Sequence, residues 1–174
     1  MKNSSSILVL IAIASMAIVM QACKKEKNSL NGECSIEERT YHFFPASHLS
    51  LQYYGVDSTL VSPEIIKGAG DKLVFQYLRT VDETACNCAD CGDGDWVLFE
   101  VDKSLNSFDL EAEDFEKSNL VGGVYFGFGG RFIMQPIRTG KVKGIKLNEQ
   151  EWQVEMVVPL TEFRTVKINK RFKL

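Results

Sequence analysis

Apolar residues from position 40 onward recur with a period of two far more often than with the 3.6-residue period of a helix. The segment 152–158 is the clearest case, because four apolar residues alternate there with more polar ones: Trp152, Val154, Met156 and Val158. Such alternation predicts a strand with one buried face and one wet face. Pro159 should end this strand, because proline cannot donate a hydrogen bond to a neighbouring strand.

The preceding segment, 141–147, also alternates, but its apolar phase switches from even to odd positions at Gly144. A β-bulge at Gly144 would explain the switch. The polar residues 148–150 then form a turn, so the pattern predicts a hairpin over 141–158.

Seven further short runs are rich in β-branched or aromatic residues and are expected to be strands: 41–44, 49–54, 73–80, 96–101, 124–128, 132–137 and 165–168. A single helical turn is expected from Ser62 through Lys67, because a proline occupies the position after the serine. Residues 107–117 fit a second helix, although Phe108 and Leu110 also alternate as in a strand. The predicted fold is therefore all-β, a single antiparallel β-sandwich or β-barrel-like domain with at most one or two short helices.

The N-terminus departs from this alternating pattern. A short basic start, with Lys2, precedes an apolar run over 7–20 that only Ser15 interrupts, and Gln21-Ala22-Cys23 follows. This three-part order is typical of a secretory signal. The run is too short for an ordinary membrane-spanning helix of about 20 residues. We therefore expect residues 1–22 to be a signal peptide.

Ala22 and Cys23 at the end of this run resemble the lipobox of bacterial lipoproteins, a resemblance that covers residues 1–23 only. It implies that the Cys23 thiol receives a diacylglyceryl group, that cleavage precedes Cys23, and that the new amino group is acylated. The protein would then be anchored outside the cytoplasm, on the periplasmic side or the cell surface of the envelope. A plain signal peptide with Cys23 in a disulfide is the alternative. The polar residues 23–33 would tether the β-rich domain, 34–174.

A second group of cysteines, Cys86, Cys88 and Cys91, lies between two expected strands. An exported chain favours disulfides, and Cys34 supplies the fourth thiol. A bond between Cys86 and Cys88 would close a strained ring, so Cys34 is expected to pair with one of them and Cys91 with the other.

The same four residues, Cys34, Cys86, Cys88 and Cys91, could instead bind a soft metal ion, since three thiolates can converge on it with Cys34 or a histidine as fourth ligand. The nearby aspartates at 90, 93 and 95 do not fit the EF-hand spacing. They are expected to form a solvated acidic loop.

The charge balance argues against a nucleic-acid partner. The chain has a formal charge of −3, and beyond the signal peptide 19 basic residues face 23 acidic ones, which gives −4. His42 and His48 are the only histidines, and the sequence contains neither HExxH nor GxSxG. No cofactor is expected.

Three functions remain open on the sequence alone. The first is a non-enzymatic envelope lipoprotein, held to a membrane by the lipid on Cys23, that binds a protein or small envelope ligand or has a structural role. The second is a metal-binding lipoprotein that uses the cysteines. The third is an enzyme whose site is assembled from distant residues such as His42, His48, Asp93 and Asp95.

Overall fold

The computed structural model describes residues 36–56, 59–68, 70–82, 92–126 and 133–174. Ten strands of these segments form one sheet, and helix is all but absent, which confirms the all-β prediction. The strands are β1 (Ile36–Tyr54), β2 (Leu60–Ile66), β3 (Lys72–Asp82), β4 (Gly92–Asp102), β5 (Ser107–Leu110), β6 (Val121–Phe126), β7 (Ile133–Pro136), β8 (Lys141–Asn148), β9 (Glu151–Pro159) and β10 (Thr165–Lys173). The described residues include no helix long and apolar enough to span a membrane.

Six strands close into an antiparallel barrel in the order β1-β2-β7-β6-β4-β3. The long strand β1 closes the ring because it pairs twice, with β3 as far as Ser47 and with β2 from His48 onward. The register shifts between Phe44 and Ser47, and Ala46 has a φ of 48°, so β1 bends at this point. One bent strand thus replaces the two strands of 41–44 and 49–54 that the sequence predicts.

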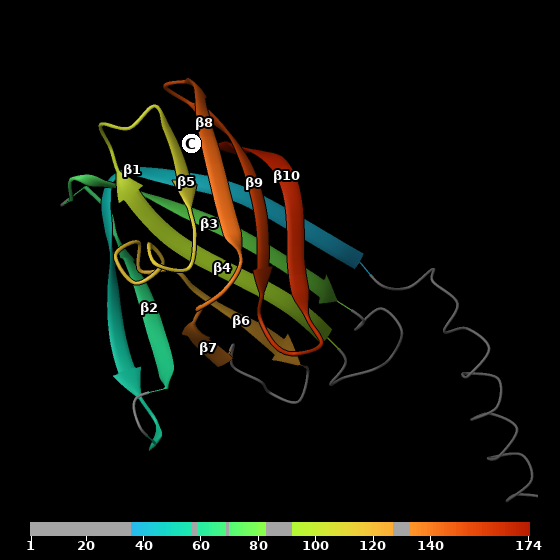
Figure 1. Cartoon of the computed structure of the whole chain (residues 1–174). Helices are drawn as coiled ribbons and strands as arrows, with labels where there is room; N and C mark the ends of the chain where they lie inside the picture. The colour runs from blue at the N-terminus through green and yellow to red at the C-terminus, as the bar shows by residue number, and fades with distance from the viewer. Residues whose placement is uncertain (1–35, 57–58, 69, 83–91, 127–132) are drawn as a thin grey trace, which may run out of the picture.

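The other four strands, β10-β9-β8-β5, continue the sheet from β1 and form a second layer beside the barrel (Figure 1). They join β1 through a single parallel pair, His42 with Lys173. The architecture therefore combines the two predicted alternatives, because a closed barrel shares one wall with a sandwich.

Strands β3 and β4 form the shared wall and are buried on both faces. Val74 and Leu98 point into the small core of the barrel, which is filled by Leu49, Val61, Val74, Leu98, Val121 and Met134. Phe75 and Phe99 point into the larger core between the layers, where their rings stack with centroids 4.9 Å apart. Trp152 of β9 meets Phe75 edge-on at 5.6 Å. Burial on two faces explains why β3 and β4 are nearly continuous hydrophobic runs.

The predicted hairpin over 141–158 is present as β8 and β9, and β9 ends at Pro159 as expected. The bulge predicted at Gly144 is wrong, because the register shifts instead between Lys146 and Asn148. Gly144 pairs regularly with Val154 of β9. It faces the core, as Val142 does at the preceding even position. Ile145 and Leu147, at odd positions, are 60% and 46% exposed on the outer side. Their apolar side chains gave the sequence pattern of a phase switch although they are not buried.

Both helical predictions are wrong. Residues 62–67 belong largely to β2, which closes the barrel, and Ser107–Leu110 forms β5 at the edge of the second layer. After β5 the chain runs through turns, where Leu120 N donates to Phe115 O at 2.9 Å. Phe108 is buried from a strand and Phe115 from these turns, so their helical spacing arises from two different backbone conformations.

Candidate functional site

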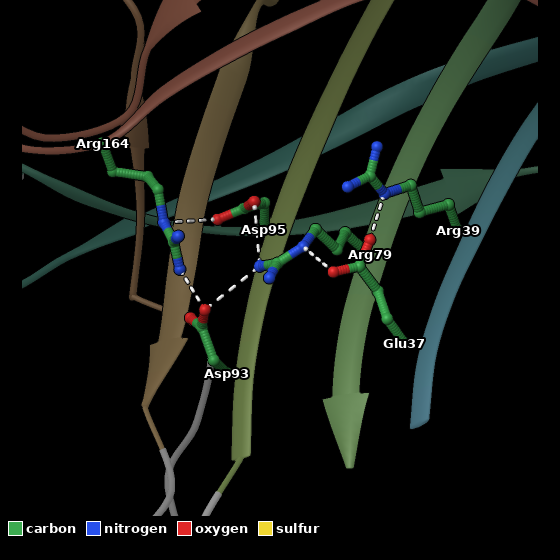
Figure 2. Close-up of polar contacts among 6 residues, drawn as sticks. All are labelled: Glu37, Arg39, Arg79, Asp93, Asp95 and Arg164. Carbon is green, nitrogen blue, oxygen red and sulfur yellow. Dashed lines mark hydrogen bonds and ion pairs between the residues drawn. The ribbon is translucent and has the colours of Figure 1, made fainter. Parts of the chain in front are cut away.

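A network of ion pairs among buried, partly buried and exposed side chains lies where β1 and β4 begin and β3 ends. Six side chains meet there, and we call them the charged cluster: Glu37, Arg39, Arg79, Asp93, Asp95 and Arg164 (Figure 2). Three arginines balance three carboxylates, so the charged cluster has no net charge.

Strand alternation places five of these residues on the face of the sheet that carries the larger core. On β3, Arg79 follows Phe75 and Tyr77, and on β4, Asp95 precedes Val97. The ladder sets Arg79 directly opposite Asp95. The apolar core thus gives way to ion pairs at the ends of the strands, where burial is no longer complete. Arg164 comes from the β9–β10 turn and joins the second layer to this wall.

The arginines bind the carboxylates by several short contacts (Figure 2). Arg79 Nη1 lies 3.1 Å from Asp93 Oδ2 and 3.4 Å from Asp95 Oδ2, and its Nε lies 3.2 Å from Glu37 Oε2. Arg164 Nε lies 3.0 Å from Asp95 Oδ1, and its Nη2 donates a hydrogen bond to Asp93 Oδ2. The side chains of Asp95 and Arg79 are only 7% and 15% exposed, so these pairs are shielded from salt more than surface pairs.

The two aspartates respond differently to this setting. Burial raises the pKa of Asp95 above its usual 3.8, and the opposing attraction of Arg164 and Arg79 does not cancel the effect. Burial also acts on Asp93, but hydrogen bonds from Arg164 and then Arg79 outweigh it and lower the pKa of Asp93. The desolvated ring of Tyr77, close to Asp95, has its pKa raised to about 12.

This arrangement suits a structural clamp better than acid–base chemistry. Each carboxylate of the charged cluster is engaged by an arginine, and the pKa of Glu37 is lowered by its hydrogen bond from Arg39. A general base has to reach a substrate proton, whereas both oxygens of Asp95 and Oδ2 of Asp93 contact arginines, and Asp93 Oδ1 is buried. The expectation of a solvated acidic loop is therefore wrong for Asp93 and Asp95, which belong to β4.

The structure does not bring the two histidines to these aspartates. His42 lies opposite Gln76 on β3, whereas Asp93 lies opposite Val81. The five-residue offset along β3 corresponds to about 16 Å. His48 pairs with Ile66 beyond the bend of β1. A site formed jointly by the two histidines, Asp93 and Asp95 would require β1 and β4 to pair with β3 in a different register.

The predicted cysteine sites lie outside the described residues. This applies to Cys23 and Cys34 in 1–35 and to Cys86, Cys88 and Cys91 in 83–91. Lipidation, disulfides and a cysteine metal site therefore stay predictions. Within the described segments, no group of three or more His, Cys, Asp or Glu side chains is placed to hold a metal ion.

Sequence reasoning named only Asp93 and Asp95 of the charged cluster and missed Glu37, Arg39, Arg79 and Arg164. The sequence does indicate Arg79, because this charged residue occupies the next position on the face of β3 that Phe75 and Tyr77 direct into the core. Such a position calls for a buried partner of opposite sign. Arg164 has no comparable signal, because only the packing of the second layer brings its turn to β4.

Two hollows on the described surface are the candidate ligand sites. One, lined by residues of β1 and of the segments 115–121 and 136–138, lies beside Tyr53 and Arg138 and has a volume of about 40 Å³. The other is a shallow depression of about 380 Å³ beside the β8–β9 turn, lined by Asn148, Gln150, Glu151, Lys173 and Leu174. The first is far below the 300 Å³ or more typical of small-molecule sites. The second is polar and open, unlike the mostly apolar clefts that enclose ligands.

Comparisons of the chain with protein-family models, with curated proteins and with solved structures found no match.

Proposed function

We propose that the protein is a lipid-anchored, non-enzymatic lipoprotein of the cell envelope, whose β-domain binds a partner on its outer surface or has a structural role. The observation that carries the proposal is Cys23, placed directly after Ala22 at the end of the apolar run 7–20. Acylation at this cysteine would hold the domain durably, because a multiply acylated residue buries many methylenes at about 0.8 kcal/mol each.

The geometry of the domain supports a surface partner over an enclosed ligand. Side chains fill the barrel interior that the described residues form, where Val74, Leu98 and Met134 are almost fully buried, and the hollow beside Tyr53 measures only about 40 Å³. A small ligand would need a larger cavity. A protein or an extended envelope polymer needs only an exposed face or loop.

The charged cluster supports a non-catalytic role. Its arginines and carboxylates neutralise each other, and they join the start of β1 to β3, β4 and the β9–β10 turn. Such pairing fixes the ends of strands that precede and follow the cysteine segment. A rigid frame that presents loops is a common way to build a binding surface.

Lipid attachment can be tested by growing an exporting bacterium that carries the full chain with an alkyne-tagged palmitate. The wild-type protein should incorporate the label and partition into detergent, whereas Cys23→Ser should do neither. The matched control is Cys34→Ser, which removes a different thiol and should keep the label. Equal labelling of wild type and Cys23→Ser would refute the anchor.

The same membranes provide the test of binding against catalysis. The lipidated wild-type protein, cross-linked in intact cells, should yield a saturable adduct with an envelope component. Turnover of an envelope substrate by the purified protein, lost in Arg164→Ala or in His42→Ala, would overturn the non-enzymatic part of the proposal.

A further inference from the structure

Phe163, in the β9–β10 turn, is 90% exposed, the largest exposure among the large apolar residues of the described chain. The turn that carries it is held by its own hydrogen bonds. Leu160 N donates to Arg164 O at 2.7 Å, and Phe163 N donates to Thr161 Oγ1 at 3.2 Å. The ring is therefore displayed from a fixed backbone rather than from a loose chain end.

The next residue, Arg164, anchors the turn to the domain. Its guanidinium contacts Asp95 at 3.0 Å and also binds Asp93, so the turn is locked to β4 (Figure 2). A phenylalanine side chain has only two rotatable bonds, so it gives up little conformational entropy when it contacts a partner. Hydrogen bonds and ion pairs thus order a turn whose apolar ring is exposed to water.

The surface beside the turn carries apolar and basic side chains, together with the exposed acidic side chain of Glu162. Val157 of β9 and Lys167 of β10 form the outward-facing pair about 7 Å along the strands from the Pro159–Thr165 pair that flanks the turn. Both side chains are exposed. We call Phe163, Val157 and Lys167 the turn patch. A ring that can enter an apolar layer next to a lysine that can stay at its polar edge is typical of membrane-interface contacts.

The turn patch lies at the end of the domain from which the tether departs. Ion pairs run from Arg164 through Asp93 and Arg79 to Glu37, the second residue of β1. The sequence between Cys23 and β1 comprises residues 24–35, so Cys23 and Ile36 can lie at most about 47 Å apart. A lipid on Cys23 would therefore keep the start of β1 within this distance of the bilayer surface and allow this end of the domain to reach it.

We propose that the turn patch docks the domain against the phospholipid bilayer that holds its anchor, with Phe163 inserted among the headgroups and Lys167 at the phosphates. The inference rests on the proposed lipidation of Cys23. Tethering makes this second contact intramolecular, so a weak patch is sufficient. Burial of one phenylalanine shifts the balance between docked and free orientations by roughly 10- to 100-fold.

The test places a tryptophan probe at the turn patch of the full lipidated chain in vesicles of phosphatidylethanolamine and phosphatidylglycerol, with or without bromine on the upper part of the acyl chains. Phe163→Trp carries the probe. Leu147→Trp is the matched control, because Leu147 is an exposed apolar residue near the β8–β9 turn. Emission of the wild-type protein, which contains Trp96 and Trp152, is subtracted.

The Phe163→Trp probe should be blue-shifted and should lose most of its emission in brominated vesicles, while Leu147→Trp should lose little. An unquenched probe at 163 in vesicles that co-float with the protein would overturn the docking proposal and leave the anchor intact. Loss of co-flotation of the wild-type protein would instead refute the anchor. Equal quenching of both probes would also overturn docking through this patch.

Discussion

Replacing Gly144 with alanine should destabilise the protein, although alanine is usually harmless in a strand of ordinary backbone geometry. A Cβ atom at this position would lie less than 3.0 Å from three ring carbons of Phe108, closer than real Cβ atoms approach any atom. The ring has little room to retreat, because it stacks on Trp152 at 5.6 Å and meets Phe75 edge-on at 5.4 Å. The change therefore overpacks the larger core.

Overpacking of this kind costs about 1–3 kcal/mol. For a chain of this length that corresponds to a fall in the unfolding midpoint of roughly 2–12 °C. The assay is thermal and urea denaturation of the two proteins under identical conditions, followed by circular dichroism. Ile145→Thr is the matched control, since it changes the next side chain of β8 on the exposed face and should alter stability by less than about 0.5 kcal/mol.

A double-mutant cycle identifies the cause. Phe108→Leu alone should destabilise by leaving a cavity, but the Gly144→Ala change should cost much less in that background, because the leucine vacates the space of the ring. The two changes should therefore be less destabilising together than the sum of the single effects by about 0.5–3 kcal/mol. Strict additivity, or a Gly144→Ala protein as stable as wild type, would refute this account of β5 and β8 packing.

Buried polar groups give three more tests. Glu100 accepts hydrogen bonds from Leu49 N at 2.7 Å and from Asn119 Nδ2 at 2.8 Å, so Glu100→Leu should cost about 1–3 kcal/mol in urea titrations, and an unchanged midpoint would contradict the contacts. Burial raises the pKa of Asp95, so its ionisation weakens the fold. The stability of wild type relative to Asp95→Asn should fall as the pH rises from 3.8 through the raised pKa, and a flat difference would argue against burial as the cause. Tyrosinate absorbance should show one group with a pKa of about 12 that disappears in Tyr77→Phe, whereas an unchanged titration would place that ring in water.

The sequence by itself determined the class of fold. Period-two alternation is a local property of a half-buried strand, so residues such as Trp152, Val154 and Met156 identified β9 and its face without tertiary information. Pro159 likewise ended β9 through its own missing donor. The expectations for Cys23 and for the thiols of 83–91 also come from the sequence alone.

The tertiary structure decided which strands meet and what each exception to the pattern means. A glycine at position 144 is compatible both with a β-bulge and with a side chain packed directly against the backbone. Only the position of Phe108 on β5 shows that the second explanation holds. The spacing of Phe108 and Phe115 fitted a helix, because burial from a strand and from a later turn can imitate a helical face.

The charged cluster shows the same limit at the candidate site. Asp93 and Asp95 were recognisable as unusual residues, but their partner Arg164 lies about 70 residues away in the sequence and comes from the other layer of the sandwich. Periodicity reports the environment of a residue along its own strand and carries no information about contacts between distant strands. The closure of the barrel by β1 and the ion pairs of Arg164 join residues that are far apart in the sequence. They form only when the two layers pack together.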